Sequence, residues 1–191
     1  MGILHRVSKR AFDLIGAGTA LIASTPLVAL AAAASRSEVG APPFERLLRA
    51  GQGGEPFAMW RLRTHPASDL GAWLRGTGLA SLPALWNVLT GEMSLVGPRP
   101  IHPVYASVAP ARQAVKPGLT GWAQLHGAAD ATWDDEQALD RWYLEHRSLT
   151  VDAMIVARTL LDRVRRPGAA AAAAPGVTRS ADARGADAVL N

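Results

Sequence analysis

The chain has 191 residues, of which 49% are hydrophobic and 19% charged, with a formal net charge of +4 and no cysteine. That length fits one ordinary domain with tails, and the lack of cysteine excludes a disulfide framework and a thiolate metal site. Every cation except Lys9 and Lys116 is an arginine, which suits phosphate-bearing partners such as nucleic acid, anionic lipid or nucleotide sugars.

An uncharged apolar run extends from residue 14 to residue 34 and is long enough to cross a bilayer. Three interpretations compete: a plain transmembrane helix, a secretory signal peptide, and a helix that enters the membrane, breaks and leaves by the same face. Pro26 removes a backbone donor near the middle of the run, and the hydroxyls of Ser24 and Thr25 can satisfy the freed carbonyls. Cations flank both ends, as expected if both stay on the cytoplasmic side. The residues alone weigh the re-entrant helix and the plain span equally, with the signal peptide third.

The middle of the chain is predicted to hold short elements. Glycines and prolines between residues 36 and 54 indicate loop and short extended structure. Residues 56–63 predict a strand. Residues 70–74 and 82–89 predict two short helices, the second with Pro83 in its first turn, where proline is tolerated.

Two longer helices are predicted near the end of the chain. Thr132 and Asp135 have the spacing of a capping box, which predicts a helix from there to about Arg147. This helix is expected to bury Leu139, Trp142 and Tyr143. A second helix is predicted from about residue 150, with a broad apolar face and several arginines. A core helix is slightly favoured for it over a helix lying in a membrane interface. The segment beyond residue 167 is poor in large apolar residues and is predicted to be a flexible tail.

Two stiff, proline-containing turns offer cations to an anion. In Gly97-Pro98-Arg99-Pro100, two prolines restrict the backbone around one arginine, as a phosphate clamp requires. By spacing alone, a rigid turn with a solvated arginine is favoured. In residues 116–122, Lys116 and Trp122 flank a similar turn, and an aromatic anchor in the core is favoured there over a phosphate loop. No histidine is spaced as a metal ligand, so no metal site is assignable, and no nucleic-acid module is recognised.

Read together, these segments resemble the bacterial sugar transferase family, the monotopic polyprenyl-phosphate phosphoglycosyl transferases. The likeness covers residues 9–159 and is carried by KRAFD at 9–13 with the apolar run, LPALWNVLTGEMSLVGPRP at 82–100, KPGLTGWAQLHG at 116–127, and the spacing of residues 133–159. Several long motifs in the same order make a chance match very improbable.

The resemblance implies a helix-rich α+β fold, monotopic in the membrane. It divides the chain into a re-entrant helix at residues 1–35, a sugar transferase domain at 36–166 and a disordered tail at 167–191. It also implies transfer of a sugar-1-phosphate from a nucleotide diphosphate sugar, usually a UDP-sugar, to polyprenyl phosphate, which starts exopolysaccharide or glycoconjugate synthesis. The expected location is the cytoplasmic face of the bacterial inner membrane, with the bilayer and both substrates as partners and no nucleic acid.

The family's catalytic residues do not all carry over. In the family an Asp attacks the phosphate next to the sugar, releasing UMP, and the Glu that follows helps to hold Mg²⁺. Here Ala80 and Ser81 stand at those two positions. The resemblance implies Arg75 and Arg99 as phosphate contacts and includes Asp152 as a candidate substrate residue. Lys116 is added from its turn.

Three hypotheses follow from that substitution. The protein transfers sugar-1-phosphate with a substitute group, for which Glu92, Asp69 and Ser81 are candidates, or it is a non-catalytic relative that binds substrates or a partner protein. An exported protein with a signal peptide is the third and fits the long internal match least. Loss of a covalent nucleophile costs on the order of 10⁴-fold or more in rate, so impaired activity is expected.

Overall fold

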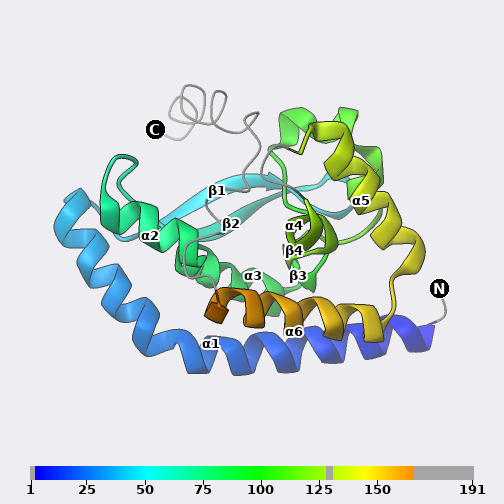
Figure 1. Ribbon diagram of the computed structural model, residues 1–191, viewed down its shortest axis with the longest axis horizontal. Coiled ribbons are helices and arrows are strands. Elements are labelled where there is room, and N and C mark those ends of the chain that lie inside the picture. The colour runs from blue at the N-terminus through cyan, green and yellow to red at the C-terminus, as the bar shows by residue number, and fades with distance from the viewer. Residues whose placement is uncertain (1–2, 128–130, 166–191) are drawn as a thin grey trace.

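The computed structural model describes residues 3–127 and 131–165 (Figure 1). Its helices and strands are, in chain order, α1 (Ile3–Val39), β1 (Phe44–Ala50), η1 (Gln52–Gly54), β2 (Pro56–Leu62), α2 (Asp69–Thr77), η2 (Leu79–Ala84), α3 (Leu85–Thr90), β3 (Ser94–Val96), η3 (Pro103–Val108), η4 (Pro110–Ala114), β4 (Gly118–Thr120), α4 (Trp122–His126), α5 (Trp133–His146) and α6 (Leu149–Arg165). Helices surround two small sheets, so the expected helix-rich α+β class is confirmed. The predicted tail lies outside the described residues.

The long helix α1 bends along its length and follows one side of the molecule (Figure 1). Pro26 lies inside it, and the hydroxyls of Ser24 and Thr25 both donate to the Leu21 carbonyl, at 3.3 and 2.7 Å. Proline inside a helix removes one backbone hydrogen bond and kinks the axis. Residues 6–39 form the one helix in the described part of the chain that is long and apolar enough to cross a membrane.

The strands of the described residues form two separate two-stranded sheets. β1 and β2 are antiparallel and pair Phe44 with Leu62 through to Ala50 with Pro56. The strand predicted at 56–63 is therefore confirmed, and β1 is the extended structure expected before it. β3 and β4 are parallel and pair Ser94 with Gly118.

The core divides into neighbouring apolar clusters. The first half of α1 packs on α3, β3 and α6 around Val88 and Ile155, and the second half packs Ala31 and Ala32 against β2 and α2. Both halves of α1 therefore pack against the same domain.

Several local predictions need correction. The 82–89 segment is a 3₁₀ helix followed by a short α-helix, and Pro83 lies inside the 3₁₀ helix instead of in the first α-turn. The capping box of Thr132 and Asp135 is confirmed. Leu139 and Trp142 are only half-buried, and α5 instead buries Tyr143 with two carboxylates described below.

Candidate functional site

The turn that carries Ala80 and Ser81 links α2 to η2. Gly78 ends α2 in the left-handed region at φ 76°, where glycine is favoured, and the Ser81 amide donates to the Gly78 carbonyl at 3.0 Å. Ala80 is 1% exposed and packs in the apolar cluster with Ala31 and Ala32. Ser81 is half-buried. The position at which the resemblance places the nucleophile is thus occupied by a buried methyl group.

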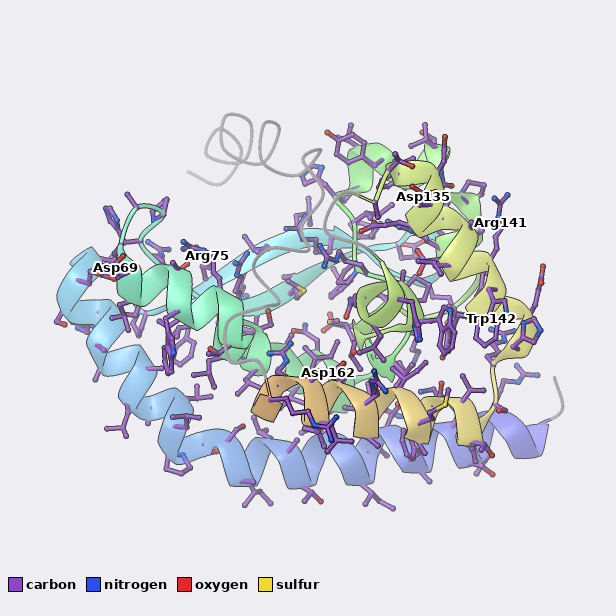
Figure 2. The ribbon with its side chains drawn as sticks, in the orientation of Figure 1. Asp69, Arg75, Asp135, Arg141, Trp142 and Asp162 are labelled. Atoms are coloured by element: carbon purple, nitrogen blue, oxygen red, sulfur yellow. The ribbon has the colours of Figure 1, made fainter. Side chains whose placement is uncertain are left out.

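Arg75, an expected phosphate contact, is bonded within its own neighbourhood. Its Nη1 donates to Thr64 Oγ1 at 2.9 Å and to the His65 carbonyl at 3.1 Å, and its Nη2 donates to the Pro66 carbonyl at 3.0 Å. These bonds close the loop that leads into α2. Figure 2 shows Arg75 on α2, across the molecule from Trp142 on α5.

The two stiff turns of the sequence form one parallel unit. The Gly97 amide donates to the Thr120 carbonyl at 2.9 Å, and the Gly118 amide donates to the Pro98 carbonyl at 2.8 Å. A Cβ on Gly97, Gly118 or Gly121 would overlap the facing backbone, so glycine is needed for this close approach. The sequence indicated two separate turns and gave no sign that they pair.

Lys116 lies beside Arg10 at the C-terminal end of α3. A Cβ on Gly91, at the C-terminal end of α3, would lie 3.5 Å from Lys116 Nζ and 3.4 Å from Arg10 Nη2. Arg10 donates to the Val88 and Leu89 carbonyls at 2.6 and 2.7 Å, so these cations complement the C-terminal dipole of α3. Burial, and then the neighbouring Arg10, lower the pKa of Lys116.

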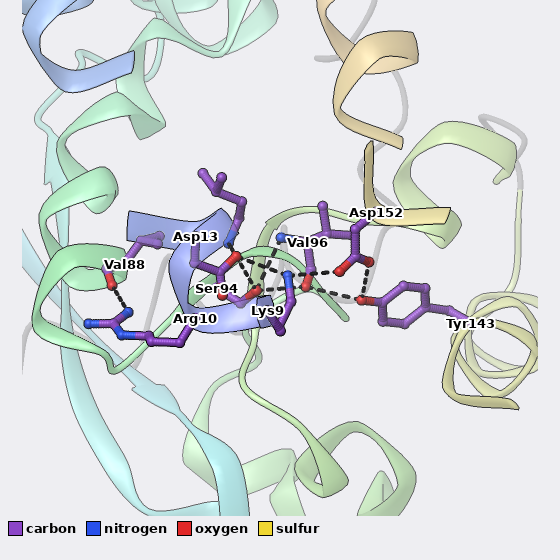
Figure 3. A network of polar contacts seen from close by, with 9 residues as sticks. Lys9, Arg10, Asp13, Val88, Ser94, Val96, Tyr143 and Asp152 are labelled. Atoms are coloured by element: carbon purple, nitrogen blue, oxygen red, sulfur yellow. Dashed lines mark hydrogen bonds and ion pairs between the residues drawn. The ribbon is translucent and has the colours of Figure 1, made fainter. Parts of the chain in front are cut away.

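Asp152 belongs to a buried polar network that joins both ends of the sequence (Figure 3). Its Oδ1 accepts from the Tyr143 hydroxyl at 2.8 Å, and its Oδ2 lies 3.0 Å from Lys9 Nζ. The same ammonium lies 2.9 Å from Asp13 Oδ1, which also accepts from Ser94 Oγ at 3.0 Å. Burial, and then the Asp152 charge, raise the pKa of Tyr143. Both Asp152 oxygens are therefore engaged within the protein, and its role as a substrate residue stays a prediction.

A second buried charge cluster was not anticipated. The Nη2 atom of Arg112 lies 3.0 Å from the Oε2 atom of Glu136. Its Nε atom lies 2.6 Å from the Oδ2 atom of Asp140, as an ion pair whose angle does not suit a hydrogen bond. Its guanidinium also stacks on the Trp133 ring at 4.5 Å. Glu136 and Asp140 are one helical turn apart, a spacing that places both on the same face of α5.

Arg99 is half-buried and lies close enough to Asp140 to affect its ionisation. Burial raises the pKa of Asp140 to about 6, against the opposing charge of Arg112, with a further rise from Glu136 and a further opposing effect from Arg99. Among the described residues, no hydrogen bond or ion pair joins Arg99 or Lys116 to Ala80 and Ser81, so convergence of these residues stays a prediction.

The candidate substitutes for the nucleophile are also placed. Glu92 Oε2 accepts from Asn87 Nδ2 at 2.7 Å and from Thr90 Oγ1 at 3.0 Å, which closes the end of α3. Asp69 is exposed in the first turn of α2. Neither shares a contact with the 78–81 turn among the residues described.

The residues at that turn do not fit the Mg²⁺ ion implied by the family. Mg²⁺ prefers carboxylate oxygens, and Ala80 and Ser81 offer a methyl group and one hydroxyl. Within residues 3–127 and 131–165, no group of three or more His, Asp or Glu side chains could hold a metal ion.

A shallow apolar groove of about 160 Å³ borders the residues that follow Ser81. It is lined by Leu21, Thr25, Val28 and Ala29 of α1, with Phe44, Leu82 and Pro83. The Thr25 hydroxyl is bonded to a backbone carbonyl and adds little polarity. The bend of α1 and the start of η2 therefore share an apolar surface.

Comparison with known proteins bears on this arrangement. A family model described as bacterial sugar transferase matches residues 4–166. The chain is 33% identical over 173 positions to the uncharacterized sugar transferase EpsL of Bacillus subtilis, covering 81% of this chain and 86% of that one. It is 37% identical over 192 positions to a UDP-glucose:undecaprenyl-phosphate glucose-1-phosphate transferase of Caulobacter vibrioides, covering 83% and 72%. It is 32% identical to the exopolysaccharide production protein ExoY of Sinorhizobium fredii, covering 81% and 84%. The chain therefore belongs to the bacterial sugar transferase family.

Proposed function

We propose that this protein binds a UDP-sugar and a polyprenyl phosphate at the cytoplasmic face of the bacterial inner membrane. It transfers sugar-1-phosphate to the lipid far more slowly than family members that carry the Asp-Glu pair. The observation that carries the proposal is the family match along residues 4–166, which includes relatives named as undecaprenyl-phosphate sugar-1-phosphate transferases. The product would start an exopolysaccharide or glycoconjugate.

The shape of α1 supports a re-entrant membrane helix. Near its start, Lys9 and Asp13 bond to α6 and β3, and near its end Ser35 donates to the Arg63 carbonyl. A straight helix of 37 residues would hold its ends about 55 Å apart at 1.5 Å per residue, on opposite sides of a bilayer. Between the two anchored ends the outer face exposes Ile15, Ile22, Leu27 and Leu30, which suits contact with lipid.

The low rate follows from the residues at the 78–81 turn. A methyl group cannot attack phosphorus, and the Ser81 hydroxyl has no base bonded to it among the described residues. Without the nucleophile, a covalent phospho-sugar intermediate on residue 80 cannot form.

Release of UMP from a UDP-sugar tests the proposal. Detergent-solubilised protein with polyprenyl phosphate and Mg²⁺ should release UMP slowly. The double change Ala80→Asp with Ser81→Glu should raise the rate at least ~10-fold, because loss of a nucleophile costs on the order of 10⁴-fold. The variant Ala80→Asn with Ser81→Gln has matched size without the charges and should stay slow.

Fast turnover by the unaltered chain would show that a substitute group performs the chemistry. An unchanged rate in the folded double variant would contradict the role given to the missing Asp-Glu pair. Donor binding without any UMP release would assign the protein a role as a binding or partner subunit.

A further inference from the structure

The turn at residues 77–81, which carries Ala80 and Ser81, is contacted by an arginine from the last turn of α6. Nη1 of Arg163, in the last turn of α6, donates to the Thr77 carbonyl. Its guanidinium lies directly over Gly78, where any Cβ would overlap it. The C-terminal part of α6 thus lies against the turn that holds Ala80 and Ser81, as the position of Asp162 beside the α2–α3 region also indicates in Figure 2.

This guanidinium has no carboxylate partner among the described residues. Its neighbour Asp162 pairs instead with Arg158 at 3.5 Å. Burial alone lowers the pKa of Arg163, although a guanidinium stays protonated at neutral pH. Arg163 is half-buried, and a partly desolvated cation without a counterion favours binding of an anion.

Donors remain available for such an anion. A guanidinium has five N–H donors, and one hydrogen bond, to Thr77, is formed here. None of the Arg163 nitrogens is fully buried without a partner, so the unused donors reach solvent. By contrast, Arg75, three residues before Gly78, forms three hydrogen bonds to residues 64–66.

We infer that Arg163 forms a phosphate-binding site with the 77–81 turn, which takes the diphosphate of the nucleotide-sugar donor without a divalent cation. The guanidinium supplies the positive charge, and the Ser81 hydroxyl, half-buried and one 3₁₀ turn beyond Gly78, is a second donor. The turn has no carboxylate to repel the anion or to hold a metal. This inference rests on the proposed function for the identity of the donor.

Equilibrium binding of UDP to the full chain in detergent tests the inference. The dissociation constant should differ less than about threefold between buffer with EDTA and buffer with Mg²⁺. Arg163→Gln should weaken binding at least tenfold in both buffers. Arg158→Gln is the matched control, because Arg158 lies on the same helix and is exposed, and it should bind like the unaltered protein.

A second variant leaves Arg163 in place. Ser81→Asp adds a carboxylate to the same turn, three residues beyond Gly78, and in EDTA it should also weaken UDP binding at least tenfold. Thermal unfolding shows whether each variant is folded. If UDP binds only with Mg²⁺, or if folded Arg163→Gln and Ser81→Asp bind normally, the inference fails while the proposed function stands. If the unaltered chain binds no UDP in either buffer, both fail.

Discussion

At the residue scale, one ammonium group forms ion pairs with two buried carboxylates. Lys9 lies 2.9 Å from Asp13 and 3.0 Å from Asp152, and both acids are 3% exposed. Removing one member of a buried ion cluster leaves uncompensated charge, which costs about 3–5 kcal/mol. Lys9 therefore holds α1 to α6 through charge as well as packing.

Replacing Lys9 should destabilise the protein strongly. Lys9→Met is expected to lower the melting temperature in detergent by at least about 6 °C, from about 2–4 °C per kcal/mol for a chain of this size. Lys9→Arg should recover most of the loss. The comparable change Arg6→Met, at an exposed position of the same helix, should shift the melting temperature little. Equal effects at the two positions would contradict the role given to Lys9.

Asp140 should make stability depend on pH. Its pKa is raised from 3.8 to about 6 by burial, with Arg112, Glu136 and Arg99 as the facing charges. A carboxyl group with a higher pKa in the folded state favours folding at low pH, and this contribution is lost as the pH rises from about 4 to about 6. Over that interval, the free energy of unfolding should fall relative to Asp140→Asn by on the order of 2 kcal/mol. Urea unfolding at several pH values measures it, with exposed Asp134→Asn as a control. A constant difference across this interval would contradict the expectation.

The local sequence predicted some residues better than others. The capping box at Thr132 and Asp135 was predicted because both partners lie three residues apart. The pairing of Arg112 with Glu136 and Asp140, and of Arg163 with Thr77, joins distant segments. Spacing along the chain carries no signal for such contacts.

At the element scale, the bend of α1 was predictable, because Pro26 and the hydroxyls of Ser24 and Thr25 are adjacent in the sequence. The strand at β2 and the helices α5 and α6 followed from periodicity and capping. The 82–90 segment was predicted less well, because tertiary contacts decide its geometry: Asn87 accepts from the Trp60 amide and donates to the Ala58 carbonyl, both at 2.9 Å. The pairing of β3 with β4 could not be predicted either, since each strand has three residues.

The topology of α1 can be tested by labelling, because the chain has no cysteine of its own. Single changes Val7→Cys and Ser37→Cys place one thiol near each end of α1, at exposed positions. A re-entrant helix should let a membrane-impermeant thiol reagent label both from the cytoplasmic side and neither from the other side. Val104→Cys, exposed in the remaining domain, reports the side of the membrane on which that domain lies. Labelling of the two ends from opposite sides would establish a span.

At the scale of the whole molecule, apolar surface gathers on α1 and the outer side of α6. Met154, Leu160 and Leu161 of α6 are about half or more exposed, and α6 runs beside the first part of α1 (Figure 1). The inner side of α6 fits the prediction of a core helix, because Ile155 is fully buried there. Its outer side has the character of an interfacial helix.

The link between Lys9 and Asp152 also constrains the order of events during synthesis. Ribosomes release the chain from its amino end, so α1 emerges while its electrostatic partner on α6 is still untranslated. During that interval the apolar helix carries Lys9 and Asp13 without Asp152 and Tyr143. We therefore expect ribosome-bound nascent chains that stop before residue 149 to be far more sensitive to protease than the finished protein.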